Sequence, residues 1–265
     1  TYIDEVPLPK CKKGCLLIKS SMSLISSGTE RMLVDFGKSN YIDKARKQPD
    51  KVKMVLNKIK TDGLASTYEA VKSKLEQPMP MGYSNVGEVI EVGHGVSGFK
   101  VGDRVVSNGR HAEVVCVPKN LVTKVPDEVH SEEAVFTVVS SIALQGVRIT
   151  NPSIGESIVV IGLGLIGLIT IQILKANGCR VLGMDTDQEK INLAKKLGIE
   201  AIKLDKNVNA IKKGVDFSFG YGVDGVIITA STKSNEPLHN AAQMSRKNGR
   251  ITLVGVIGTE INRND

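Results

Sequence analysis

A short glycine-rich run offers the clearest chemistry in this sequence. The run is Gly162-Leu163-Gly164-Leu165-Ile166-Gly167, and its spacing is GxGxxG. The first glycine allows a tight turn, the second lets a pyrophosphate approach the backbone, and the third lets a helix pack against a strand. Free N–H groups at the start of that helix would then face the phosphates. The same spacing also occurs in turns that bind no nucleotide, so its context decides the interpretation.

The elements expected around this run have the order that the motif requires. The apolar stretch 157–161 predicts a strand before it, and 165–177 predicts a helix after it. A strand is expected over 180–184, a helix over 188–197, and strands over 223–229 and 250–256 with a helix over 237–244 between them. Alternation of strands and helices predicts a parallel, doubly wound sheet.

Asp185 ends the strand that follows the glycine run, about 20 residues further along the chain. A carboxylate at that place can accept hydrogen bonds from both ribose hydroxyls of NAD and would repel the 2′-phosphate of NADP. Asp185 could instead be a turn residue, since Asp187 lies beside it and could share the role. Lys190 either reaches the adenosine ribose or is solvated.

The first half of the chain has a different pattern. Alternating polar and apolar residues over 1–36 predict strands, and short strands separated by glycines over 82–118 predict a small barrel. Helical spacing over 37–75 predicts one or two helices, and this stretch holds ten basic residues against four acidic ones. Residues 131–150 are expected to form a helix. We therefore expect a domain over 1–148, with a basic helical insert over 37–75, and a second domain over 149–265.

Composition excludes several classes of protein. With 41% hydrophobic and 24% charged residues, the 265-residue chain is an ordinary globular protein of about two domains. Aromatic residues make up only 4%, so the net charge of +7 does not predict nucleic-acid binding. No apolar run reaches the roughly 18 residues of a membrane span. The four cysteines form no CxxC pair, which favours free thiols in the cytoplasm, with a metal pair at Cys11 and Cys15 as the alternative.

Further motifs resemble the medium-chain dehydrogenase/reductase superfamily. They are Gly87-Glu88-Val89-Ile90-Glu91-Val92-Gly93, Gly98-Phe99-Lys100-Val101-Gly102-Asp103-Arg104-Val105, Val223-Asp224-Gly225-Val226-Ile227-Ile228 and Gly249-Arg250-Ile251-Thr252-Leu253-Val254-Gly255. The resemblance implies an α/β protein in which a GroES-like β-barrel catalytic domain precedes a Rossmann domain that binds NAD. It also implies that Ser141 lies near the nicotinamide and that Gly255 belongs to the cofactor site. The superfamily's next strand and its return to the first domain are missing, so truncation at both ends is expected.

The resemblance also shows where a catalytic zinc would be held. Zinc-dependent members have a Cys-Gly-Thr-Asp run where this chain has Ser27-Gly28-Thr29-Glu30, and a Gly-His-Glu run where it has Gly82-Tyr83-Ser84. Serine and neutral tyrosine are poor zinc ligands. The cysteines of a structural zinc lobe, expected after Val105, are also missing. We therefore expect no metal, and we interpret His94 and His111 as isolated loop histidines.

Without a Lewis acid, hydrogen-bond donors must stabilise charge on a carbonyl oxygen during hydride transfer. Thr29 corresponds to the superfamily's hydroxyl that relays the alcohol proton, and Tyr83 replaces a metal ligand. We expect Tyr83 to donate to the substrate oxygen and Thr29 to relay the proton. The alternatives are a packed aromatic residue and a turn hydroxyl. Glu30 is expected to lie beneath the site with a structural role.

The narrowest resemblance concerns the residues around Thr29, the basic insert and the run at Tyr83. Together they are similar to zinc-free dehydrogenase domains of bidomain oxidoreductases in polysaccharide biosynthesis, and also to bacteriochlorophyllide dehydrogenases. The expected function is NAD-linked oxidation or reduction of an alcohol or carbonyl, including that of a sugar or nucleotide sugar. The basic insert would favour an anionic small-molecule substrate, and the intact protein would be a homodimer. The alternatives are a quinone or enoyl C=C reductase, and a cofactor-binding module without turnover.

Overall fold

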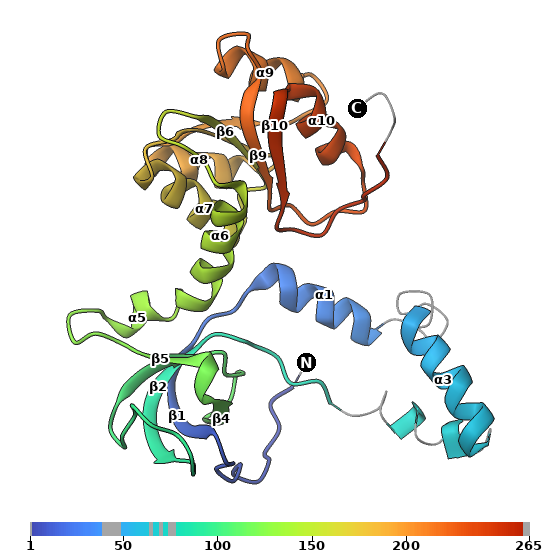
Figure 1. The fold of residues 1–265 in the computed structure, drawn as a ribbon, viewed down its shortest axis with the longest axis vertical. Coiled ribbons are helices and arrows are strands. Elements are labelled where there is room, and N and C mark those ends of the chain that lie inside the picture. The colour runs from blue at the N-terminus through green and yellow to red at the C-terminus, as the bar shows by residue number, and fades with distance from the viewer. Residues whose placement is uncertain (1, 39–48, 64–65, 69–70, 74–77, 262–265) are drawn as a thin grey trace. The chain divides into compact units, whose positions relative to one another are not determined.

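The computed structural model describes residues 2–38, 49–63, 66–68, 71–73 and 78–261 (Figure 1). The chain divides into two compact units, Thr1–Val135 and Phe136–Asp265. The expected boundary after residue 148 falls within the last turn of helix α6 (Thr137–Thr150). The division precedes this helix because α6 packs into the second unit. Its Val147 is buried in the same cluster as Ile158, and Gly146 lies against the side chain of Val254.

The first unit is built on a five-stranded antiparallel sheet with the order β4-β1-β2-β3-β5. Alternate apolar residues of these strands, including Leu16, Ile18, Val89, Val105 and Val115, form its buried core. The structure has this antiparallel sheet where a small barrel was expected. The strands are β1 (Cys15–Ser23), β2 (Asn85–Val92), β3 (Arg104–Ser107), β4 (Val114–Pro118) and β5 (Val122–Lys124), with a short 3₁₀ turn η1 (Lys119–Leu121) before the last.

The expectation of strands throughout 1–36 holds only for β1, since residues 2–14 form no strand and the last third is helical. The chain forms helix α1 (Ser27–Lys38) there, because a start signal follows β1: the carboxylate of Glu30 accepts a hydrogen bond from the N–H of Ser26 at 2.9 Å. Helix α3 (Pro49–Asp62) agrees with the expected helical insert. The part of the insert at 39–48 lies outside the described residues. Within the described ranges, no helix is long and apolar enough to cross a membrane.

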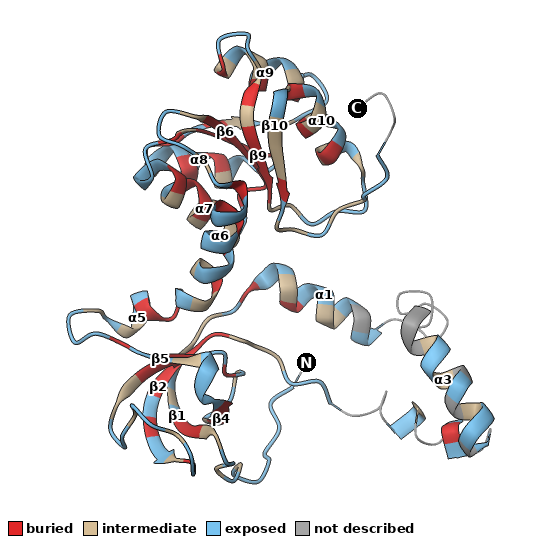
Figure 2. Ribbon diagram, in the orientation of Figure 1, coloured by how far each residue is buried: buried red, intermediate tan, exposed pale blue. Residues whose placement is uncertain are grey.

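The second unit is a parallel sheet with the order β10-β9-β6-β7-β8, covered on both faces (Figures 1 and 2). Ile158 and Val160 of the central strand pack with α6, α7 and α8, whereas Val159 and Ile161 pack with α9 and α10. Successive side chains of β6 therefore point to opposite faces of the sheet. Because both faces are buried, the strand is apolar at every position from 158 to 161. The elements are β6 (Ser157–Ile161), α7 (Leu165–Ala176), β7 (Arg180–Asp185), α8 (Gln188–Lys196), β8 (Glu200–Lys203), α9 (Ala210–Phe217), β9 (Val223–Ile228), α10 (Glu236–Met244) and β10 (Ser245–Leu253).

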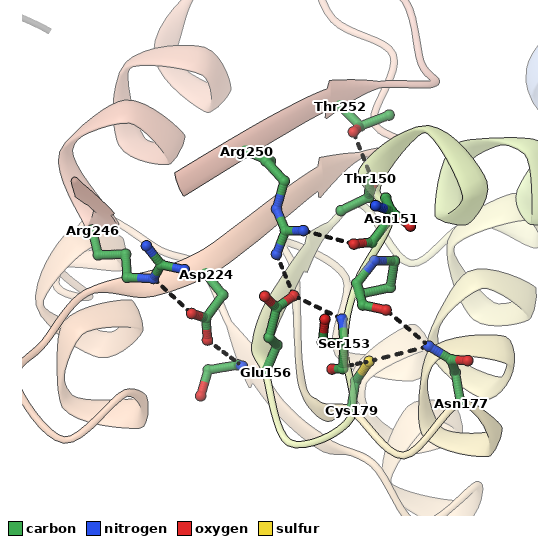
Figure 3. Close-up of polar contacts among 12 residues, drawn as sticks. Thr150, Asn151, Ser153, Glu156, Asn177, Cys179, Asp224, Arg246, Arg250 and Thr252 are labelled. Atoms are coloured by element: carbon green, nitrogen blue, oxygen red, sulfur yellow. Dashed lines mark hydrogen bonds and ion pairs between the residues drawn. The ribbon is translucent and has the colours of Figure 1, made fainter. Parts of the chain in front are cut away.

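Polar contacts tie together the amino ends of the strands in this sheet (Figure 3). Asp224 accepts hydrogen bonds from Nε of Arg246 and from the N–H of Ser157, both at 2.7 Å. Burial disfavours the Asp224 carboxylate, but these two donors outweigh burial and lower its pKa. Arg250 pairs with Glu156 and donates to the carbonyl oxygen of Asn151 at 2.6 Å. These contacts stabilise the amino ends of the strands, whereas the glycine run lies at their carboxyl ends.

Three expectations for the linking helices and strands needed correction. The single helix expected over 131–150 is broken into α5 (Ser131–Ala134) and α6, with Phe136 at the start of the second helix. Strand β10 begins earlier than expected, at Ser245, and ends at Leu253. The elements β8 and α9 were not foreseen, because with four and eight residues they are too short to establish a period.

Candidate active site

The glycine run, 162–167, forms a turn between β6 and α7, which we call the glycine loop. Gly162 has a φ of 97°, and a Cβ there would lie 2.6 Å from the backbone nitrogen of Ala230. A Cβ on Gly167 would overlap the carbonyl oxygen of Gly162, so helix and turn touch directly. By contrast, a Cβ on Gly164 would meet no atom within 4 Å. The loop is therefore packed against protein at its ends and open in the middle, as a pyrophosphate requires.

Helix α7 starts immediately after Gly164, which is its N-cap. Its first residues, Leu165 and Ile166, lie in the turn whose N–H groups have no partner within a helix. These donors and the helix dipole favour an anion at this end.

Asp185 closes one side of the glycine loop. Its side chain is only 9% exposed, and its carboxylate accepts hydrogen bonds from the N–H of Leu163 at 2.6 Å and from that of Asp187 at 2.9 Å. Nζ of Lys190 lies 3.6 Å from Oδ1 of Asp185 and 3.7 Å from Oδ2 of Asp187. Asp187 itself caps α8 through the N–H of Glu189. The structure therefore gives Asp185 a structural role toward the loop that its place in the sequence did not reveal.

The other side of the glycine loop is formed by the chain after β9 and β10. Thr229 donates from Oγ1 to the carbonyl oxygen of Gly162 at 2.5 Å. A Cβ on Gly255 would overlap the carbonyl oxygen of Ala230, so the two segments touch. Strand β6 lies between β7 and β9. The chain adds β7 and β8 on one side of β6, and then returns to add β9 and β10 on the other side. Such a switch point at the carboxyl ends of parallel strands is where open α/β sheets bind ligands. The sequence analysis missed Thr229 and Ala230.

Ser141 lies on α6 and lines a groove of about 350 Å³ in the second unit, with Gly146 of the same helix and Leu253 and Val254 at the end of β10. Its hydroxyl donates to the carbonyl oxygen of Val138 at 2.7 Å. Ser141 is therefore close in space to the segment that leads to Gly255. Its oxygen can still accept a hydrogen bond.

The two expected catalytic hydroxyls are in the first unit, on neighbouring segments. Thr29 is half-buried in the first turn of α1, and Tyr83 is half-buried two residues before β2. The segments are adjacent because Ser23 pairs with Asn85 across β1 and β2, and the N–H of Leu24 donates to the carbonyl oxygen of Ser84 at 3.0 Å.

The residues expected at the positions of the zinc ligands are Ser27, Tyr83 and Ser84, which offer only hydroxyl groups. Ser27 is exposed at the start of α1, and the buried Ser84 donates its hydroxyl hydrogen to the carbonyl oxygen of Val135 at 2.6 Å. Neither these hydroxyls nor the phenol of Tyr83 is a good zinc ligand at neutral pH. The Cys11 thiol contacts backbone oxygens, that of Cys15 at 3.7 Å among them. In the part of the chain that the structure describes, no three metal-binding side chains converge.

The expectation that His111 is isolated was wrong. Its Nε2 lies 3.1 Å from Oε1 of Glu30, and its Nδ1 lies 2.8 Å from Oγ of Ser23. Glu30 is buried, in agreement with the structural role expected for it. No sequence spacing links residues 23, 30 and 111, so only the pairing of β1 with its neighbours could bring them together. His94 is exposed in the turn after β2.

Comparison with known proteins gives matches to both units. Residues 52–127 match the alcohol dehydrogenase GroES-like domain, and residues 166–264 match the zinc-binding dehydrogenase domain. The chain is 31% identical over 225 residues to (R,R)-butanediol dehydrogenase of Bacillus subtilis, which covers 71% of this chain and 62% of the relative. It is 29% identical over 226 residues to an alcohol dehydrogenase of Geobacillus stearothermophilus, covering 72% of this chain and 64% of the relative. The chain thus spans less than two thirds of either relative.

Solved structures show the same fold. The crystal structure of the Bacillus subtilis 2R,3R-butanediol dehydrogenase superimposes with a TM-score of 0.72 at 24% identity, covering 99% of this chain and 77% of that one. A zinc-dependent alcohol dehydrogenase 2 from Streptococcus pneumonia gives 0.76 at 19% identity, covering 98% and 74%. Galactitol-1-phosphate dehydrogenase from Escherichia coli gives 0.73 at 18% identity, covering 98% and 73%. The two units thus match, in this order, the two domains of zinc-binding, medium-chain alcohol dehydrogenases, and the chain is similar to that family.

Proposed function

We propose that this protein is an NAD(H)-dependent oxidoreductase that works without zinc and transfers a hydride between nicotinamide and an alcohol or carbonyl. The observation that carries the proposal is the glycine loop with its open middle at Gly164, closed on one side by Asp185. When bound there, the nicotinamide cofactor accepts or supplies the hydride. Leu165 and Ile166 would supply N–H donors to the pyrophosphate, while Ser141 and Gly255 would border the nicotinamide end of the site.

The cofactor preference rests on charge. Asp185 stands at the end of β7, where the adenosine ribose of a dinucleotide is recognised. Its two oxygens already accept from Leu163 and Asp187, and each carboxylate oxygen has capacity for a further hydrogen bond. The ribose hydroxyls of NAD can supply these bonds, whereas the 2′-phosphate of NADP would meet a like charge. Lys190 would contact the same ribose.

The case against zinc rests on the donors that the chain offers. Ser27, Tyr83 and Ser84 stand where the family has its ligands, and none is a thiolate, imidazole or carboxylate. In place of a Lewis acid, the Tyr83 phenol would donate a hydrogen bond to the substrate oxygen as negative charge develops there. Thr29 would pass the proton that this oxygen gains in reduction or loses in oxidation. Hydride to carbon and proton to oxygen then balance the reaction.

The substrate class is proposed from the resemblance of the runs at Thr29 and Tyr83 to dehydrogenases of polysaccharide biosynthesis. A sugar, sugar phosphate or nucleotide sugar with an oxidisable hydroxyl agrees with it. The basic insert over 37–75 would attract an anionic substrate of this kind. Four of its lysines, Lys44, Lys47, Lys51 and Lys58, have side chains outside the described residues.

The experiment is a substrate panel on protein treated with a chelator, followed through the absorbance of NADH. The panel contains 2,3-butanediol, sugar alcohols, sugar phosphates, nucleotide sugars and enones. Turnover of an alcohol or carbonyl supports the proposal. Turnover of enones alone favours C=C reduction, which a tyrosine donor would serve equally well. Tight NADH binding with no turnover would instead indicate a cofactor-binding module.

A further inference from the structure

One imidazole in the first unit joins three segments of the chain. Nδ1 of His111 lies 2.8 Å from Oγ of Ser23, the last residue of β1, and Nε2 lies 3.1 Å from Oε1 of Glu30 in the first turn of α1. The N–H of His111 also donates to the carbonyl oxygen of Met81 at 2.9 Å. The segments that His111 connects are therefore those that carry Thr29 and Tyr83.

The ring is also packed against the residue that precedes Tyr83. Gly82 has a φ of 86°, which favours glycine. A Cβ at this position would lie 2.6 Å from both Cγ and Nδ1 of His111. Residue 82 thus has no side chain because the imidazole occupies that space. The place of Tyr83 depends on a backbone that rests directly on the ring.

The partners of the ring determine how its two nitrogens are used. Glu30 is buried, with its side chain 9% exposed, and its Oε1 also accepts from the N–H of Ser26 at 2.9 Å. An ionised carboxylate can only accept, so a neutral ring carries its hydrogen on Nε2 and accepts the Ser23 hydroxyl hydrogen at Nδ1. A replacement must therefore supply both a donor and an acceptor to keep all three segments together.

We propose that His111 is a positioning residue for the reaction: through Ser23, Glu30 and Met81 it holds the Tyr83 and Thr29 hydroxyls in place. This inference rests on the proposed function, since it assigns His111 a role toward the proposed hydrogen-bond donor Tyr83 and the proposed proton relay Thr29. It extends that function because neither the glycine loop nor the family's metal positions involve residue 111. Displacing a catalytic group by about 1 Å can lower turnover about 100-fold.

The first test is chemical rescue of His111→Gly, using the member of the panel that turns over fastest. We expect kcat to fall about 10- to 100-fold, while the dissociation constant of NADH stays within about twofold, since the glycine loop is in the other unit. Added imidazole should restore much of the lost rate. Pyrrole lacks the acceptor nitrogen and N-methylimidazole lacks the donor, so neither should. His94→Gly, at an exposed histidine, is the control. Unchanged kcat, or equal rescue by pyrrole, would overturn the proposal.

The second test needs no turnover and covers the case in which the glycine variant fails to fold. Protein labelled with fluorotyrosine has five tyrosine signals, and Tyr83→Phe identifies that of Tyr83. In His111→Gln we expect the fluorine signal of Tyr83 to shift or broaden while the other four stay in place. An unmoved Tyr83 signal would overturn the proposal. A moved signal in a protein that turns over no alcohol or carbonyl supports the positioning role and counts only against the proposed function.

Discussion

Replacing Gly164 by alanine separates cofactor binding from folding. Its φ of −69° and ψ of −170° lie in a region that any residue adopts, and a Cβ there would meet no atom within 4 Å. The folded chain therefore accepts alanine at this position. The added methyl group would project into the open middle of the glycine loop, which the pyrophosphate must approach.

The expected size of the effect follows from these contacts. Alanine is a poorer N-cap than glycine, so Gly164→Ala should lower the free energy of unfolding by about 1 kcal/mol or less. The affinity for NADH should fall about 10- to 100-fold, because the methyl group would keep the phosphates away from the backbone of the loop. Each factor of ten corresponds to about 1.4 kcal/mol of lost contact with the phosphates. Gly167→Ala should instead act mainly on folding and lower the free energy of unfolding. Its Cβ would overlap Gly162, and the resulting strain of about 1–3 kcal/mol exceeds the roughly 1 kcal/mol that alanine contributes within a helix.

The assay combines urea unfolding with fluorescence titration of NADH. Gly37→Ala is the matched control, since a Cβ at Gly37 on α1 also meets nothing within 4 Å but lies in the first unit. It should change NADH affinity less than twofold. A folded Gly164→Ala protein that binds NADH as tightly as the unmodified protein would refute the placement of the phosphates at this loop.

Three further outcomes are expected. Asp185→Asn should weaken NADH binding and narrow the preference over NADPH, measured by titration of both; equal affinities in the unmodified protein would contradict the role of Asp185. Tyr83→Phe and Thr29→Val should each lower kcat about 100-fold and leave NADH binding unchanged, and an unaffected rate would remove them from the site. The folded state lowers the pKa of Asp224, so its contribution to stability is present above the unfolded value of about 4 and is lost as the pH falls below it. Asp224→Asn should flatten the acid limb of unfolding free energy against pH, and an unchanged slope would count against this account.

The Rossmann unit could be predicted closely because its strands are buried on both faces and its helices are amphipathic. The strand predicted at 157–161 has the bounds of β6, and the helix predicted from 165 starts where α7 does. The first unit was harder. Alternation near Leu24 suggested a longer strand, whereas the contact between Glu30 and Ser26 starts a helix. Such a hydrogen bond between a side chain and a backbone group four residues apart is hard to predict from the sequence, although it begins the helix in the structure.

The candidate site divides in the same way. The glycine loop and Asp185 could be found because their spacing is local and has a direct physical reason. Thr229, Ala230 and His111 could not, because they reach their partners only through strand pairing between distant segments. Asp185 was found for its charge, but its bond to Leu163 depends on the adjacency of β6 and β7. Sequence patterns thus identified the groups proposed to bind the cofactor, and the structure identified the residues that contact them.

The most direct test of the central claim follows a label from cofactor to product. The protein is treated with a chelator, its zinc content is measured, and NADH carrying deuterium at the transferable position is supplied with the carbonyl members of the panel. We expect mass spectrometry to find one deuterium on the product carbon while zinc stays far below one ion per chain. Label that never leaves the cofactor, or that transfers only after zinc is added, would contradict zinc-independent hydride transfer.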